Sequence, residues 1–182
     1  MQTYEFIAQA MGIIGLLFGS FSFQMKTGRG VLLLQSIGSL FYMVNYYMLG
    51  AYMGAILNLL AILRSIVYGY REKFRAERLF WLIAFSLTYI LSYVLLFTVF
   101  GHPATTRNLC VEIIPLIAMV IATVAIRKGT ARSIRVYAFA YSPMWLAYNI
   151  INFSIGAILG ETINLISVII GVLRYDIKKN RS

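Results

Sequence analysis

Seven apolar stretches, each about as long as a bilayer is thick when coiled into a helix, fill most of this sequence. They run approximately over residues 4–25, 30–49, 51–70, 79–100, 109–126, 134–153 and 154–175. A bilayer core of about 30 Å takes roughly 20 apolar residues as helix, whereas membrane β-strands are shorter and alternate polar with apolar residues. Because 60% of the residues are hydrophobic and only 12% are charged, we predict an all-α integral membrane protein with seven transmembrane helices, in a single membrane domain of residues 1–182.

The basic residues orient this chain. With seven spans, fourteen of the sixteen Lys and Arg residues fall in the gaps on one side, and only Arg107 lies on the other side. Arg64 lies within the third span, about two turns from its basic end, and is expected to snorkel to that surface. The excess of positive charge marks the cytoplasmic side, so we expect the N-terminus outside and the C-terminus in the cytoplasm. The clusters are interpreted as topogenic charge, with no role in binding nucleic acid.

The sequence also repeats itself at an offset of 106 residues. Residues 50–59 read GAYMGAILNL and residues 156–165 read GAILGETINL, and the same offset pairs Ser36 with Ser142 and Tyr42 with Tyr148. A match of this kind over almost fifty ungapped residues indicates a structural repeat. We therefore predict two parallel three-helix repeats, 1–75 and 104–182, joined by a linker helix in 76–103. A pseudo-twofold axis along the membrane normal relates such repeats, and substrate sites of repeat-built transporters lie between them near the midplane.

The matched amides Asn58 and Asn164 are the leading candidates for such a site. Each lies about seven residues into its span, and an amide both donates and accepts hydrogen bonds. The two amides could bind a neutral polar solute. Alternatively, they could hydrogen-bond to each other or to neighbouring backbone groups and so hold the helices together. The other candidates are polar or aromatic side chains at similar depth, where bundle packing is the alternative role. The predicted solute-binding residues are Asn58, Asn164, Trp145, Ser39, Tyr42, Ser142 and Tyr148.

Glu161 is interpreted as the only carboxylate well inside a span, and its repeat partner is Ala55. An ionisable group in the membrane is a functional hypothesis by default. We expect it to couple protons or to recognise a cation. Tyr46, Tyr47 and Tyr52 lie near the outer boundary and are expected to form part of the aromatic belt.

As a whole, the sequence resembles the YgjV family of bacterial inner-membrane proteins. The residues that carry the resemblance are the opening GIIGLLFGSFSFQMKT, the segment LLLQSIGSLFYMVNYYMLGAYMGAILNLLAILRSIVYGYR and the closing INLISVIIGVLRYDIKK. Its 3+1+3 arrangement, with an Asn at equal depth in two matching spans, is similar in architecture to SWEET sugar facilitators and PnuC vitamin transporters. The resemblance implies a multi-pass protein of the bacterial inner membrane, and the charge asymmetry then predicts a periplasmic N-terminus.

Several function classes can be weighed from the residues. Intramembrane hydrolysis needs a Ser–His, paired-Asp or H-E-x-x-H constellation, but His102 lies in an outer loop, expected to be an exposed turn, and the only Asp is Asp176. We therefore expect no enzyme, no cofactor and no metal site. The leading prediction is a transporter or facilitator of a small polar metabolite, such as a sugar, a sugar acid or a vitamin, which works by alternating access. The alternative is a structural or assembly protein of the membrane, and a homo-oligomer is compatible with either role.

Overall fold

The computed structural model describes residues 3–177, and within that range every regular element is a helix. Seven of the helices are long, and one short helix and one π-helical turn complete the fold. They are α1 (Thr3–Ser22), α2 (Gly28–Met48), α3 (Tyr52–Gly69), α4 (Arg71–Phe74), α5 (Leu79–Thr98), α6 (Thr106–Arg127), α7 (Ala131–Ile151), α8 (Ile155–Gly171) and the turn η1 (Val172–Ile177).

Threonine caps set the beginnings of three of these helices. The hydroxyls of Thr27, Thr105 and Thr130 accept hydrogen bonds from backbone N–H groups three residues later, at the starts of α2, α6 and α7. Such a cap satisfies one of the N–H groups that a helix leaves free at its first turn. The turn into α7 also uses Gly129, whose φ of 75° suits glycine. The expected spans are thus confirmed as helices, with ends that differ by a few residues.

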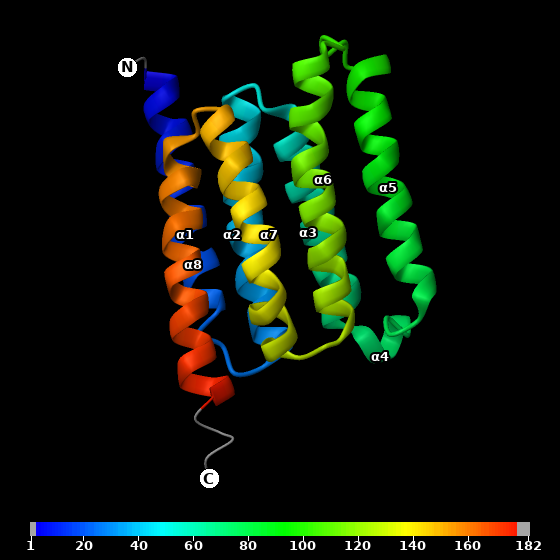
Figure 1. Cartoon of the computed structure of the whole chain (residues 1–182), viewed down its shortest axis with the longest axis vertical. Coiled ribbons are helices and arrows are strands. Elements are labelled where there is room, and N and C mark those ends of the chain that lie inside the picture. Colours follow the sequence, from blue (N-terminus) through cyan, green and yellow to red (C-terminus); the bar gives the residue numbers. More distant parts are fainter. Residues whose placement is uncertain (1–2, 178–182) are drawn as a thin grey trace.

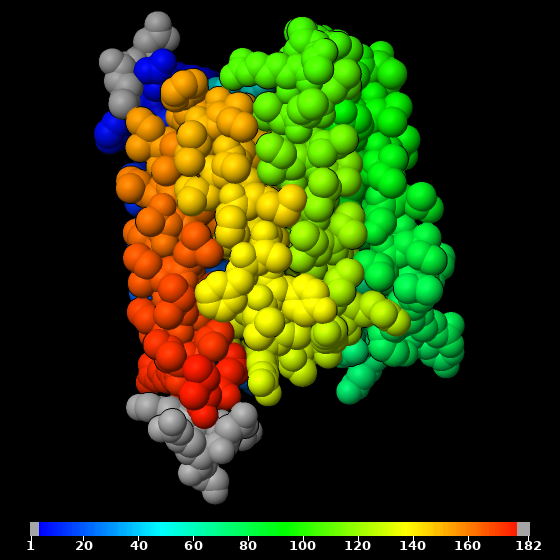
Figure 2. Space-filling model, viewed as in Figure 1, coloured from blue at the N-terminus to red at the C-terminus, as the bar shows by residue number. Residues whose placement is uncertain are grey.

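The seven long helices form two layers of three, with α5 at one edge (Figure 1). The space-filling view shows the face that α8, α7, α6 and α5 form (Figure 2). In the first layer α2 packs between α1 and α3, and in the second α7 packs between α6 and α8. Across the layers α1 packs on α8, α2 on α7 and α3 on α6, while α5 contacts α3 and α6. We call α1–α3 the first triplet and α6–α8 the second triplet. Exchanging α1 with α6, α2 with α7 and α3 with α8 maps the contacts within one triplet onto those within the other and the α1–α8 contact onto the α3–α6 contact. A twofold axis that runs between α2 and α7, parallel to the helices, would have the same effect.

Both triplets run in the same direction, and the described ends of the chain lie at opposite ends of the bundle (Figure 1). Since the long helices alternate in direction, the connections α1–α2, α3–α5 and α6–α7 share one end with η1. The basic residues of those connections therefore gather at this end, which we call the basic end. Lys178, Lys179 and Arg181 of the same predicted cluster lie outside the described residues.

Six helices of the described chain are long and apolar enough to cross a membrane, namely α1, α2, α3, α5, α6 and α8 extended by η1. The remaining expected span, α7, has 21 residues but is not among them. Arg132 and Arg135 lie in its first two turns, and their charge lowers the apolar character of the segment. Large apolar side chains on the outer faces of all seven long helices are exposed, as expected of surfaces that face lipid.

The contact between α1 and α8 is tight because it combines small residues with polar bonds. A Cβ built on Gly12 would lie 3.4 Å from the Cα of Gly156, so the two backbones approach closely. Nearer the basic end, Gln24 of the α1–α2 connection extends this contact. Its side-chain amide donates to the backbone carbonyl and to the hydroxyl of Ser167 on α8, both at 2.9 Å. The Ser167 hydroxyl in turn donates to the carbonyl of Ser20 at 2.6 Å.

A buried ion pair closes the basic end between α7 and η1. Nε and Nη2 of Arg135 donate to the two carboxylate oxygens of Asp176, at 2.9 and 2.7 Å. The remaining nitrogen, Nη1, donates to the backbone carbonyls of Phe23 and Met25. Both charged side chains are almost fully buried. The guanidinium of Arg135 thus joins η1 to the α1–α2 connection.

Candidate functional site

A cavity of about 110 Å³ lies between the two triplets. This is room for several water molecules. Every helix of both triplets contributes to its wall. The polar residues of the lining are Gln35, Ser39, Tyr42, Tyr46, Asn58, Arg64, Ser65, Tyr141, Ser142, Trp145, Glu161 and Asn164.

The structure brings most of the predicted site residues to this one cavity. Asn58, Asn164, Trp145, Ser39, Tyr42 and Ser142 line it, as does Glu161. Tyr148 does not, although it is fully buried nearby. Gln35 and Tyr141, two further polar residues of the mid-depth stripes in the sequence, also line the cavity. The polar residues of the wall that sequence reasoning did not propose for a site are Tyr46, Arg64 and Ser65.

The two matched amides face the cavity but do not bond to each other. Nδ2 of Asn58 donates to the carbonyl of Gly54 in its own helix at 2.9 Å. Oδ1 of Asn164 accepts from the hydroxyl of Ser20 on α1 at 2.9 Å. Asn164 therefore joins two helices, whereas Asn58 uses only its own turn. The two matched amides therefore differ in their role: one joins helices and the other does not.

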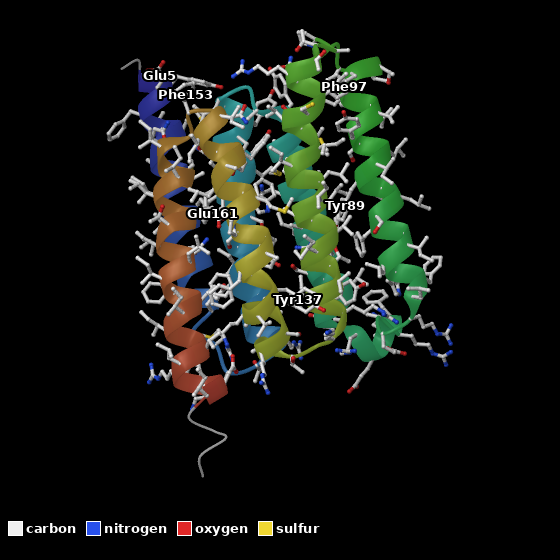
Figure 3. All side chains as sticks on the ribbon, in the orientation of Figure 1. Glu5, Tyr89, Phe97, Tyr137, Phe153 and Glu161 are labelled. Carbon is white, nitrogen blue, oxygen red and sulfur yellow. The ribbon has the colours of Figure 1, made fainter. Side chains whose placement is uncertain are left out.

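Glu161 lies at mid-height on α8, as Figure 3 shows, and belongs to the same wall. Its Oε1 is 3.5 Å from Nδ2 of Asn164, and its Oε2 is buried without a hydrogen-bond partner among the described residues. The unpaired oxygen is free to accept a proton donor that enters the cavity.

Arg64 does not snorkel to the basic end, so that expectation is wrong. It is 5% exposed and lines the cavity from α3. Its Nη1 donates to the carbonyl of Met119 at 3.2 Å and to the hydroxyl of Thr123 at 3.1 Å, both on α6. These acceptors hold the side chain inside the bundle. The sequence could not reveal them because they lie 55 and 59 residues away.

An aromatic cluster of Tyr42, Tyr46, Trp145 and Tyr148 packs between α2 and α7. The ring of Tyr46 lies 6.1 Å from those of Tyr42 and Trp145 and 6.3 Å from that of Tyr148. Tyr46 is only 2% exposed, and its hydroxyl donates to Oδ1 of Asn149 at 2.6 Å. It was expected in the aromatic belt, and that expectation is wrong because its face of α2 turns toward α7.

A second buried carboxylate, Glu112 on α6, extends this cluster and was missed by sequence reasoning. It is 5% exposed and accepts a hydrogen bond from the hydroxyl of Tyr148 at 3.0 Å. Its other oxygen lies 3.7 Å from Nε2 of His102, whose ring packs 5.4 Å from that of Phe97. His102 is therefore half-buried, in contrast to the exposed turn that was expected. The approach of the α5–α6 connection to Glu112 explains the difference.

Replacing Tyr148 by phenylalanine should lower the free energy of unfolding by about 1–3 kcal/mol, since it removes the hydroxyl bonded to the buried Glu112 carboxylate. Thermal unfolding of the purified protein measures the change. Tyr137→Phe is the matched control, because no hydrogen bond of the Tyr137 hydroxyl occurs within residues 3–177. Equal stability of Tyr148→Phe and the wild type would contradict the role of this bond.

The wall of the cavity is chemically mixed. It combines amides, hydroxyls, a guanidinium, a carboxyl group and aromatic rings, which suits the recognition of a small polar molecule. A family model described as Imp-YgjV, bacterial inner membrane protein, matches residues 6–179 of the chain. No curated protein and no solved structure matches it.

Proposed function

The chain belongs to the Imp-YgjV family of bacterial inner-membrane proteins, and we propose that it transports a small polar metabolite across that membrane. In this proposal the two triplets rock against each other. The cavity between them then opens in turn to the periplasm and to the cytoplasm.

The position of the cavity carries the proposal. Asn58 and Ser39 reach it from the first triplet, and Asn164 and Ser142 reach it from the second. Motion between the triplets would therefore expose groups that bind solute to one side and then to the other. A structural or assembly protein has no need for a polar wall at this depth, where burying unpaired polar groups costs free energy.

The proposed topology has seven crossings, with α7 as the sixth in chain order. Support comes from its length of 21 residues and its packing between α6 and α8. The proposed orientation places the basic end in the cytoplasm, because cytoplasmic connections carry the excess of Lys and Arg. The α5–α6 connection then faces the periplasm.

Cysteine labelling from each side of the membrane tests the proposal without a known solute. The exposed Cys110 is first replaced by serine. Ser39→Cys and Ser142→Cys are then introduced singly, since the two serines line the cavity from opposite triplets. In right-side-out and in inside-out vesicles, an impermeant maleimide should label both cysteines.

Three control variants fix the interpretation. Ala104→Cys in the α5–α6 connection should react only from the periplasmic side, and Glu72→Cys in α4 only from the cytoplasmic side. Leu33→Cys, at a residue that is 63% exposed on the lipid-facing surface, should react from neither. Cavity cysteines that react from one side only, or from neither, would contradict alternating access and favour an assembly role.

A further inference from the structure

Arg64 is a buried cation with an unoccupied binding edge. Its Nη1 bonds to two neutral acceptors on α6, while its buried Nε has no hydrogen-bond partner among the described residues. No carboxylate within residues 3–177 pairs with it: Glu112 lies near the imidazole of His102, and Asp176 forms its ion pair with Arg135. A buried charge without a counter-charge costs several kcal/mol.

Arg135 shows what the empty edge would hold. In that residue Nη1 also donates to neutral carbonyl oxygens, and the edge formed by Nε and Nη2 binds both carboxylate oxygens of Asp176. Arg64 likewise uses Nη1 for neutral acceptors, but its buried Nε has no acceptor, and Nη2 makes none of the hydrogen bonds found within residues 3–177. Two parallel N–H···O bonds to a carboxylate are the preferred use of this edge.

The cavity wall beside Arg64 suits the polar groups that a small carboxylate would carry next to its carboxylate group. One face of α3 lines the cavity with Asn58, Ala61, Arg64 and Ser65. Along this wall the small side chain of Ala61 therefore separates the guanidinium of Arg64 from the amide of Asn58. The acidic residue of the lining, Glu161, lies on α8 and does not pair with Arg64. The repeat is broken at both charges, because the partners of Arg64 and Glu161 are Ile170 and Ala55.

We propose that the solute is a small hydroxylated carboxylate, whose carboxylate group binds the Nε and Nη2 edge of Arg64 and whose hydroxyls reach Asn58 and the neighbouring polar groups of the cavity. This inference rests on the proposed transport function and narrows its substrate class from polar metabolites to organic anions.

Matched probes test the charge requirement. Sodium D-gluconate is compared with sorbitol, and sodium lactate with propane-1,2-diol, with sodium chloride as the control for ionic strength. With the purified full-length protein, at least one carboxylate should raise the midpoint of thermal unfolding, and its neutral partner should not. Arg64→Gln should weaken that binding by roughly tenfold or more, and Arg64→Lys should weaken it less.

A second measurement keeps the test decisive if the Arg64 variants do not fold. The effective carboxylate should slow maleimide labelling of Ser39→Cys, and its neutral partner should leave the rate unchanged. Absence of any carboxylate effect, equal protection by the neutral partner, or unchanged binding by Arg64→Gln would overturn the proposal. If the cavity cysteines react from both sides but no carboxylate protects them, the carboxylate assignment fails while transport stands. If they react from neither side, the transport function itself fails.

Discussion

Asp176→Ala is expected to lower the free energy of unfolding by about 3–5 kcal/mol, the largest loss predicted for a single change in this chain. Asp176 supplies both oxygens that bind Nε and Nη2 of Arg135. Without it, the Arg135 guanidinium stays buried at the basic end, over the ring of Tyr175 and bonded to the backbone carbonyls of Phe23 and Met25, with no counter-charge among the described residues. The midpoint of thermal unfolding of the purified protein should fall by on the order of 10 °C.

Two further variants separate the ion pair from general effects of charge. Arg132→Ala removes a basic residue from the same turn of α7, but Arg132 is exposed, so the change should stay within about 0.5 kcal/mol. The double variant Arg135→Met with Asp176→Leu should recover most of the lost stability, because it leaves no unpaired charge. A loss below about 1 kcal/mol for Asp176→Ala would show that the pair does not hold the basic end.

Asn164→Ala and Asn58→Ala are expected to differ in stability although the repeat matches the two residues. Asn164→Ala removes the acceptor of the Ser20 hydroxyl and a donor 3.5 Å from Glu161, which should cost about 1–3 kcal/mol. Asn58→Ala removes only a bond to a carbonyl of its own helix and should cost less than about 1 kcal/mol, helped by the high helix propensity of alanine. Thermal unfolding of both variants in parallel measures the difference.

The same pair of variants bears on the two roles considered for these amides. If Asn164 joins helices and Asn58 is free for the solute, Asn58→Ala should weaken solute binding at nearly unchanged stability. Equal destabilisation by the two substitutions would contradict this division and would favour a purely structural role for both.

The helices and their order could be predicted because each depends on local sequence. A run of about 20 apolar residues must satisfy its backbone hydrogen bonds internally in lipid, so the lengths of α1, α2, α3, α5, α6 and α8 follow from composition alone. The 106-residue offset then indicated the two triplets. The same reasoning gave α7, but its early arginines keep it from qualifying as a span by hydropathy.

The gathering of Asn58 with Asn164 and of Ser39 with Trp145 at one cavity was predictable because each pair occupies matched positions of the repeat, which face a common axis. The neighbours of individual side chains were not. Arg64, Tyr46 and Glu112 each found a partner on a helix far away in sequence. Such partners depend on how each helix is rotated about its own axis, and the hydropathy of a nearly all-apolar span carries little information about that rotation.

The two seams between the triplets differ in how they could move. Where α1 meets α8, glycine backbones touch and the bonds of Gln24 and Ser167 close the gap. Where α3 meets α6, the side chain of Arg64 spans the distance. Any rocking should therefore pivot on the α1–α8 contact and separate α3 from α6 beside α5. A solute that took over the free edge of Arg64 would sit on the moving side of that hinge, where its arrival and departure could change how readily the protein opens.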